Sequence, residues 1–579
     1  MPKSYTYDKY EAQQRPIPSI WDLAALIFVI AFFVLVSIGT KAMVGHFELG
    51  QPIAISLSPK MLPYYALRTV LRMFIALFFS LLFTFIFGSW AAKSKSAERI
   101  IIPAIDVLQS VPVLGFLSIT VSGFILLFNG SMLGPECAAI FAIFIAQVWN
   151  MTLSLYQSIL TVPKELKEAS QMFHLSKWQH FWKIEVPCAL PGLLWNTMMS
   201  MSGSWVFLVA SEAITVNQQN ITLPGIGSYT ALAIEQANTQ AIFYVIIAML
   251  IVIFLYDQLL FRPLVAWSEK FKLEFTQGEN VSESWVLNLF LKAHFFRHFT
   301  RFFGYFSDAI VNNRWLRQVR PITRSKASKI SQLFLFYSWW LLVIMALVGS
   351  GYFIIQYIHL NLALDEIIHV SYLGLITSIR VLVLIALSAI FWVPIGVYIG
   401  LNPRLANIVQ PIVQFLAAFP ATLLFPLVVM AILRYHLNPD IWTSPLMVLG
   451  TQWYILFNVV AATTALPENM RYAVATLNVR GWLWWRKLIL PAIFPYLITG
   501  MVTAAGGAWN MSIIAEAVQW GNHQIFATGL GAYITKATSV GNFPRIVIGI
   551  VMMSVYVLII NRLIWQPLYR LAEKKYQLG

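Results

Sequence analysis

Two apolar stretches of the sequence each carry a tryptophan and a glutamate seven residues apart. The pairs are Trp205 with Glu212 and Trp509 with Glu516. Because such a separation is two helical turns, each pair lies on one helical face. A carboxylate in the bilayer centre is costly, so it is a functional candidate by default. We weigh a gate on a transport path, a brace beneath a docking surface, and a simple bond to a nearby loop.

An arginine also recurs within two other apolar stretches, at Arg72 and Arg380. Each guanidinium could attract an anionic solute, or it could pair with Glu212 and Glu516. It could also lie along the apolar surface and place its charge at the membrane interface. All of these roles are electrostatic recognition, and none makes or breaks a covalent bond.

Uncharged polar residues in the apolar stretches are further candidates for lining a path: Gln109, Gln414, Asn150, Ser200 and Ser202. Asp106 is an additional acid, for which we expect a bond between helices. Pro112 and Pro420 should kink their helices and free carbonyls that could line a cavity. The glycines should permit tight turns in an outer segment; they are Gly225, Gly227, Gly529 and Gly531.

Several kinds of chemistry are missing from the sequence. It has no spacing typical of metal ligands, no Ser/His/Asp set and no G-x-x-x-x-G-K-[ST] nucleotide loop. Two cysteines make no disulfide framework. We therefore predict no catalytic residue, no metal and no cofactor in this chain.

The composition places the candidate residues in a membrane. The chain is 59% hydrophobic and 11% charged, whereas soluble domains are about a quarter charged. About 20 continuous apolar residues span a bilayer as a helix, and such runs favour helices over a barrel. We predict about twelve transmembrane helices, at 21–44, 66–91, 101–128, 137–160, 190–215, 241–264, 333–358, 372–400, 406–433, 443–466, 492–518 and 543–566.

The sequence repeats itself. At an offset of 304 residues, Trp149 falls on Trp453 and Pro187 falls on Pro491; upstream, at an offset of 308, Arg72 falls on Arg380. The fold class we predict is therefore an all-α membrane protein built from two six-helix repeats. Because six is even, the repeats enter the membrane in parallel, related by an axis along the membrane normal.

Basic residues orient the chain. The net charge is +15, which could indicate a nucleic-acid partner, but Lys and Arg concentrate in alternate connections and at both ends. That distribution is typical of orientation in a membrane by positive loops. We predict an integral plasma (inner) membrane protein with both termini in the cytoplasm and no nucleic-acid partner.

The segment 268–332 separates the repeats, which we place at 1–267 and 333–579. It holds eleven Lys or Arg, five Asp or Glu, and many Phe. Its aromatic and basic residues recur at roughly helical spacing, which favours a helix on an anionic lipid surface. A solvated cytoplasmic linker is the alternative.

One cytoplasmic connection in each repeat has a regular pattern. In the first repeat it runs from Pro163 to about residue 190, and we expect two short helices that stop before Pro187. It resembles the EAA loop of the permease subunits of ABC importers, Glu-Ala-Ala-x3-Gly-x9-Ile-x-Leu-Pro. The residues in this frame are Glu168, Ala169, Ser170, His174 at the Gly position, Ile184, Val186 and Pro187.

The second repeat carries a degenerate version at about 467–494. Its acidic residue and its glycine are absent, and the residues in the frame are Tyr472, Ala473, Val474, Asn478, Leu488, Leu490 and Pro491. Trp178 and the Leu190-Pro191-Gly192 sequence are similar to the nitrate/sulfonate/taurine branch of this family.

The resemblance implies a fused double-length permease of a type I ABC importer. A small solute would cross between the repeats by alternating access, and the branch implies an oxyanion such as nitrate, a sulfonate or taurine. The EAA loops would dock on separate ATPase subunits, two copies, which hold the ATP and Mg, and a periplasmic or surface binding protein would deliver the solute. Alternatives are an iron, cation or vitamin importer, an ATP-independent secondary transporter, and a membrane scaffold.

Overall fold

The computed structural model describes residues 53–109, 112–128, 130–216, 219–271, 284–292, 329–464 and 476–576, with isolated positions elsewhere. The predicted first span at 21–44 and much of the 268–332 segment lie outside these residues. The chain divides into two compact units. One comprises 1–42, 157–195 and 255–323; the other comprises 43–156, 196–254 and 324–579.

Within the described part of the chain, six helices are long and apolar enough to cross a membrane. They are Pro59–Lys93, Leu133–Leu160, Thr239–Ser268, Leu364–Leu401, Gly481–Ala515 and Phe543–Ala572. Helices α9 (Val186–Glu212) and α16 (Lys329–Asn361) cover two further predicted segments. These helices confirm an all-α membrane fold, and the total of twelve spans remains a prediction.

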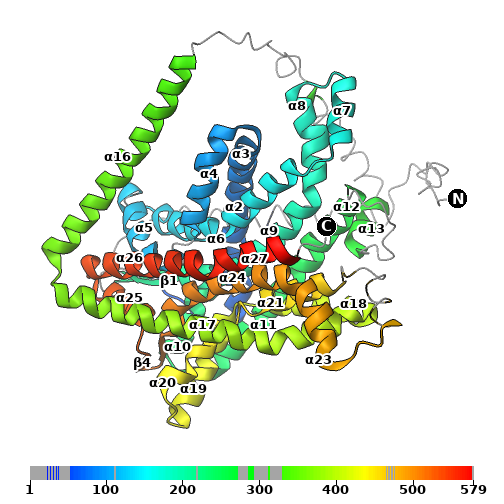
Figure 1. Cartoon of the computed structure of the whole chain (residues 1–579). Coiled ribbons are helices and arrows are strands. Elements are labelled where there is room, and N and C mark those ends of the chain that lie inside the picture. Colours follow the sequence, from blue (N-terminus) through cyan, green and yellow to red (C-terminus); the bar gives the residue numbers. More distant parts are fainter. Residues whose placement is uncertain are drawn as a thin grey trace. The chain divides into compact units, whose positions relative to one another are not determined.

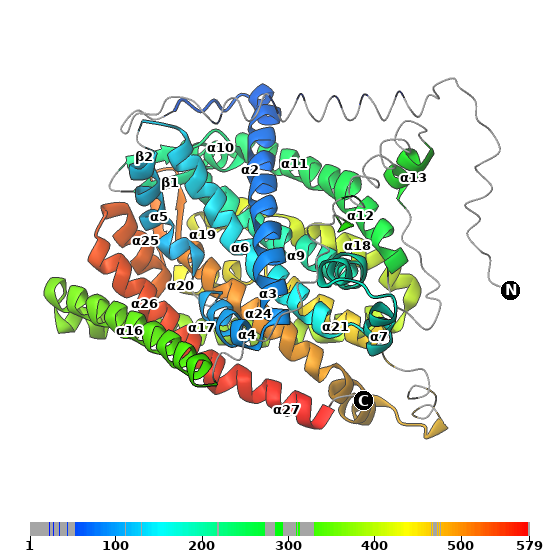
Figure 2. The same cartoon turned by 90° about the horizontal axis from the view of Figure 1, so that it is seen from above.

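Several of the long helices contain a π-helical turn. One turn, Thr84–Gly88, joins α2 (Leu62–Phe83) to α3 (Ser89–Lys93) in the long blue helix of Figure 2. Another, Asn561–Trp565, joins α26 (Phe543–Ile560) to α27 (Gln566–Tyr576), which together form the red rod of Figure 1. The first repeat has the same turn 304 residues earlier, at Asp257–Phe261, between α11 (Thr239–Tyr256) and α12 (Arg262–Ser268).

The predicted spans at 101–128 and 406–433 are each broken into two helices rather than kinked within one; the halves of the second, Arg404–Ala418 and Ala421–Arg434, form a candidate span bent by 77°. In the first repeat, α4 (Lys95–Leu108) ends and α5 (Val113–Leu127) begins after Pro112. In the second, α18 (Pro403–Ala418) ends, Pro420 is extended, and α19 (Phe425–Arg434) follows a short 3-10 turn. A residue before proline avoids the helical region, and Phe419 is accordingly extended.

The predicted span at 443–466 is wrong. Its first part forms α20 (Pro439–Trp442) and a 3-10 turn, so that α21 runs only over Trp453–Thr464. The matching helix of the first repeat, α6, is continuous over Leu133–Leu160. Pro439 and Pro445 each begin a short helical turn, which is the position where proline is favoured.

The predicted break before Pro187 is absent from the structure. Helix α8 (Lys177–His180) continues through a π-helical turn, Phe181–Glu185, directly into α9. The second repeat repeats the arrangement, with α23 (Gly481–Trp484), a π-helical turn and α24 (Leu490–Ala515). A π-helical turn accommodates the N–H that each proline lacks, so the helix does not have to end.

Two β-hairpins were not predicted. Strands β1 (Ala213–Val216) and β2 (Gln219–Thr222) pair antiparallel after α9, and β3 (Ala517–Trp520) and β4 (His523–Phe526) pair after α24. Each hairpin leads to a short helix, α10 (Ile226–Glu235) or α25 (Leu530–Val540). Strand β3 contacts α10 and β1 contacts α25, so each hairpin packs against the short helix of the other repeat.

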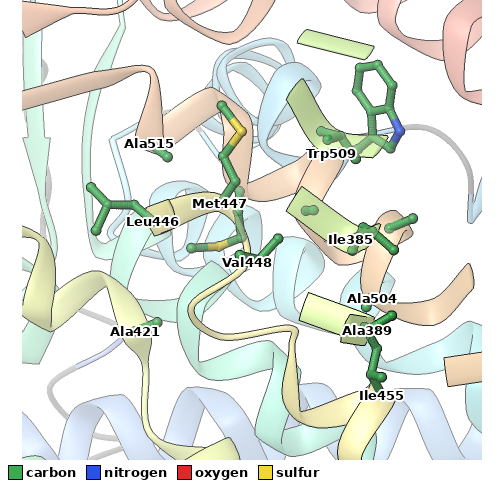
Figure 3. Packing of buried hydrophobic residues seen from close by; sticks show 14 of the residues in the cluster. Ile385, Ala389, Ala421, Leu446, Met447, Val448, Ile455, Ala504, Trp509 and Ala515 are labelled. Carbon is green, nitrogen blue, oxygen red and sulfur yellow. The ribbon is translucent and has the colours of Figure 1, made fainter. Parts of the chain in front are cut away.

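The core of the second repeat is apolar and continuous. Figure 3 shows Trp509 of α24 close to Ile385 of α17 (Leu364–Leu401), with Met447 and Val448 beside them. Val206 of the first repeat joins the same cluster. The first repeat therefore contributes to this core through α9, the helix that carries Glu212.

Candidate functional site

Four charged residues from three helices form a buried network in the first repeat. This first charge cluster consists of Arg68 and Arg72 on α2, Glu136 on α6 and Glu212 on α9, all at most 2% exposed. Arg72 donates from Nε and Nη2 to the two oxygens of Glu136, at 2.6 and 2.7 Å, and from Nη1 to Glu212, at 2.6 Å. Arg68 Nη2 also donates to Glu136. The cluster holds two positive and two negative charges, so its net charge is zero.

The Glu212 carboxylate is also held by the start of α10. Thr69 Oγ1 donates to Oε1 at 2.7 Å, and the Gly227 N–H donates to Oε2 at 2.6 Å. The Ile226 N–H in turn donates to Thr69 Oγ1 at 3.0 Å. The first N–H groups of a helix lack partners within it and favour an anion, which explains why α10 begins at this carboxylate.

Gly225 and Gly529 lie directly before α10 and α25 and serve this contact. Both have extended backbones; Gly225 lies in a turn, as expected, whereas Gly227 and Gly531 lie inside helices. A Cβ on Gly225 would lie 2.3 Å from the carboxyl carbon of Glu212, and a Cβ on Gly529 would meet Glu516 at the same distance. Glycine is needed because the backbone approaches the carboxylate so closely.

A second charge cluster, consisting of Arg380, Asp440 and Glu516, occupies the matching place in the second repeat. Arg380 Nη1 donates to Glu516 at 2.8 Å, and Thr377 Oγ1 donates to the same carboxylate at 2.9 Å. The Gly531 N–H completes the arrangement at 2.7 Å. These bonds correspond, residue by residue, to those of Glu212.

The two clusters differ in their remaining partners. Ile376 stands in place of Arg68, and Asp440 stands in place of Glu136. Arg380 Nη2 lies 3.6 Å from Asp440, and the Arg380 and Asp440 side chains are 11% and 46% exposed. The second charge cluster is therefore more open than the first, and it carries one negative charge in excess.

Of the roles left open for the two arginines, the contacts show the pairing of Arg72 with Glu212 and of Arg380 with Glu516. The alternative of a side chain reaching the interface fails for Arg72, which has no exposed surface. Arg380 lies near the middle of α17 because that helix begins at Leu364, earlier than predicted. Sequence reasoning missed Glu136 and Arg68, although Glu136 falls on Asp440 at the offset of 304.

The other candidates for a path are not gathered in one place. Trp205 and Trp509 are buried, and Trp509 is part of an apolar core. Gln414 on α18 donates to the Met198 sulfur on α9, joining the two repeats. The remaining candidates are Gln109 and Asn150, which are exposed, Ser200 and Ser202, which are buried, and Asp106, whose side chain lies outside the described residues.

The connection of the first repeat forms the two short helices that were predicted, α7 (Lys164–Met172) and α8. His174 has a left-handed backbone, with φ of 49°. The Leu175 N–H donates back to the Ser170 carbonyl at 3.0 Å, which closes the end of α7. This is a Schellman motif, whose left-handed position favours glycine and tolerates few other residues. The Gly position of the pattern is therefore the end of this helix.

The second repeat closes its helix in the same way. Asn478 has φ of 51°, and the Val479 N–H donates to the Val474 carbonyl at 3.2 Å. Ala473 lies outside the described residues. Leu488 is buried and Pro491 is partly buried, as Ile184 and Pro187 are partly buried in the first repeat.

Both connections present side chains on their surface. Phe173 and Leu477 occupy equivalent positions just before the left-handed residue and are 78% and 74% exposed. Glu168 is exposed on α7, Ala169 is partly buried and Ser170 is buried. Tyr472, at the position of Glu168, is exposed as well. Each connection therefore offers an apolar side chain beside a helix end, and the position of Glu168 is acidic in the first repeat and aromatic in the second.

A residue of the 268–332 segment reaches the first connection. The side-chain oxygen Oδ1 of Asn312 accepts from Gln179 Nε2 at 2.9 Å and from Lys183 Nζ at 3.4 Å. Gln179 also completes the capping box of α8 with Ser176. The segment thus contacts the start of α8, and its predicted contact with lipid remains a prediction.

Two matching sets of membrane helices, each with a helical hairpin connection and a carboxylate anchored by arginine, define a duplicated transport permease. The chain belongs to the family of binding-protein-dependent transport system inner membrane components, whose model matches residues 84–262 and again residues 392–566. It is thus a fused permease of the ABC importer family, as the sequence predicted.

Curated relatives match one repeat's length of the chain. The bicarbonate transport system permease protein CmpB of Synechococcus elongatus is 24% identical over 179 residues, which cover 31% of this chain and 61% of CmpB. The nitrate import permease protein NrtB of Leptolyngbya laminosa is 24% identical over 185 residues, covering 32% and 63%. The glycine betaine/carnitine transport permease protein GbuB of Listeria monocytogenes is 29% identical over 172 residues, covering 30% and 56%. The chain therefore spans about 60% of the length of these relatives.

Proposed function

We propose that this chain forms the membrane path of an ATP-driven importer, in which a small solute passes between the repeats by alternating access. The coupling elements are the connections at 163–190 and 467–494, which dock on separate ATPase subunits. The observation that carries the proposal is the structure that the two connections share. In the first, a helix ends at left-handed His174 with exposed Phe173 beside it; in the second, a helix ends at left-handed Asn478 with exposed Leu477 beside it. Exposed apolar side chains on such a connection fit a groove in a partner protein.

The proposed partners follow from what the chain offers. ATP and Mg bind to the ATPase subunits, because this sequence has no nucleotide loop. A periplasmic or surface binding protein delivers the solute, and both termini lie on the cytoplasmic side of the inner membrane. The two connections differ at Glu168 and Tyr472, so they bind their ATPases with unequal affinity or bind two different ATPases.

The proposed solute is a small oxyanion. Two relatives are named for bicarbonate and nitrate transport, and arginines recur within the membrane helices of both repeats. A second candidate is a quaternary ammonium solute, because GbuB is named for glycine betaine and carnitine. The net negative charge of the second charge cluster is compatible with such a cationic group.

Charge reversal at Glu168 tests the coupling. The chain carrying Glu168→Lys is purified with its ATPase from the native membrane, and ATP-dependent nitrate uptake is measured in vesicles. We expect at least about a tenfold loss of both bound Mg-ATPase activity and uptake, since tenfold corresponds to about 1.4 kcal/mol at an interface. Glu235→Lys makes the same change at the exposed end of α10 and should leave both unchanged.

Two results would overturn the proposal. One is uptake that continues without ATP or any bound ATPase, as expected of a secondary transporter. The other is a chain that binds no ATPase and shows no solute-dependent stimulation of hydrolysis, as expected of a membrane scaffold.

A further inference from the structure

One edge of the Arg380 guanidinium has no close carboxylate among the described residues. On Arg72, the Nε and Nη2 atoms of this edge hold the two oxygens of Glu136, at 2.6 and 2.7 Å. On Arg380, Nη2 lies 3.6 Å from Asp440 and donates instead to the Thr528 carbonyl, at 3.1 Å. Within the described part of the chain, Nε of Arg380 has no hydrogen-bond acceptor. The first repeat thus shows what fits this edge: a planar carboxylate held by two parallel bonds.

The Asp440 carboxylate is hydrogen-bonded to Thr528 rather than to Arg380. Its Oδ1 accepts from the Thr528 N–H at 2.5 Å, and its Oδ2 lies 3.4 Å from Thr528 Oγ1. It is also one methylene shorter than Glu136, and it is held at the start of α20, where the Asn438 side chain accepts from its N–H. A short carboxylate with these partners does not fill the Arg380 edge as Glu136 fills the edge of Arg72.

We propose that the Nε–Nη2 edge of Arg380 binds a small planar oxyanion, such as a carboxylate, bicarbonate or nitrate. The anion takes the place that Glu136 occupies on Arg72. This proposal rests on the proposed function, because it assigns a site in the second repeat to the oxyanion solute. Guanidinium groups recognise planar oxyanions through two parallel charge-assisted bonds, which lysine cannot reproduce.

Binding there adds a negative charge to a cluster that already holds one in excess, so the two parallel bonds from Arg380 must outweigh the repulsion from Asp440. Glu516 is already satisfied by Thr377, the Gly531 N–H and Arg380 Nη1. Arg380 is 11% exposed, whereas Arg72 is sealed from solvent. Part of the Arg380 side chain therefore lies on the protein surface, whereas the first charge cluster is fully buried.

The test uses the purified full-length chain in lipid nanodiscs, with nitrate as the probe and calorimetry as the readout. Asp440→Glu lengthens the carboxylate so that it can fill the edge as Glu136 does. Arg380→Lys keeps the charge and removes the paired donors. Each variant should weaken nitrate binding at least about tenfold. The same change at Asp365→Glu, exposed in the first turn of α17, should not alter binding.

Gel filtration shows whether each variant is folded. If Arg380→Lys unfolds, the test still stands on Asp440→Glu, because residue 440 is half exposed. The proposal is overturned if wild-type chain shows no saturable nitrate binding, or if Asp440→Glu binds nitrate as the wild type does. Bound Mg-ATPase activity is measured on the same samples. If Asp440→Glu keeps its bound ATPase activity and binds nitrate as the wild type does, only the anion site is refuted. If the chain holds no bound ATPase at all, the proposed function is refuted.

Discussion

The first and second charge clusters share one framework and differ in how it is completed. In both, an arginine, a threonine and a backbone N–H from a short helix surround one glutamate. In the first repeat a second arginine and a second glutamate close the cluster, with no side chain more than 2% exposed. In the second repeat an isoleucine and a half-exposed aspartate leave it open.

This difference separates what the fold requires from what each repeat can vary. The shared bonds depend on a close approach of the backbone, which fixes glycine at two equivalent positions. The outer partners depend on side chains alone, and these have diverged. Ion pairs that are fully buried are costly to break, whereas exposed pairs contribute little. The same substitutions should therefore have unequal effects in the two repeats.

The largest difference is expected from removing the outer carboxylate. Glu136→Gln leaves Arg68 and Arg72 with Glu212 alone in a buried site, which should cost about 3–5 kcal/mol of unfolding free energy. Asp440→Asn should cost at most about 1 kcal/mol, because that pair is long and half exposed. Thermal unfolding of the purified chain in detergent measures both. Equal losses would contradict the contrast between the clusters.

Adding a methyl group beneath the glutamate should damage both repeats alike. Gly225→Ala and Gly529→Ala each place a Cβ 2.3 Å from a carboxyl carbon, which should cost about 3 kcal/mol. Gly123→Ala on α5 is the control, since its Cβ would meet nothing within 4 Å. If only one of the two glycines is sensitive, the framework is not shared. The same thermal unfolding assay applies.

Loss of the threonine hydroxyl should have a moderate effect, again similar in both repeats. Thr69→Val and Thr377→Val each remove a donor to the glutamate and leave the N–H of Ile226 or Leu530 without its acceptor. We expect a cost of about 1–2 kcal/mol. Serine at either position keeps the hydroxyl and should restore most of the stability. Failure of serine to do so would assign the effect to packing.

The smallest effect is expected from rebuilding the first cluster in the second repeat. Ile376→Arg together with Asp440→Glu restores both missing partners and balances the charge. Because the site stays partly open, the gain should be about 1 kcal/mol or less. A double-mutant cycle of melting temperatures measures the coupling between the two changes. Additive single changes would show that the new pair does not form.

The sequence predicted the helical membrane fold and the duplication, and it offered the pairing of each arginine with its glutamate as one of several alternatives. Those predictions rested on residues of the same type that recur at a fixed offset between the two repeats. Glu136 was missed because its equivalent is aspartate, so the offset alone did not mark it as a repeated residue. The hairpins were missed because they are short and lie between long helices, where apolar length is the main signal.

Proline was the main source of error in placing helices. Pro112 and Pro420 each lie just before a new helical segment, after a break in the chain of helices, whereas Pro187 lies within a continuous helix. The difference is the π-helical turn before Pro187, which depends on backbone geometry that no residue pattern marks. At the connections 163–190 and 467–494, the residue types of His174 and Asn478 did not by themselves predict a left-handed helix end, although both tolerate that conformation better than most.

Ile376 has a consequence for how this permease can change over generations. In a transporter assembled from two copies of one gene product, replacing the residue at the Arg68 position would open both clusters at once. Here both repeats lie on one chain, so a mutation at position 376 alters one side of the molecule and leaves the other intact. Fusion thus allows one half to specialise in rigidity and the other in recognition, which a symmetric pair cannot do.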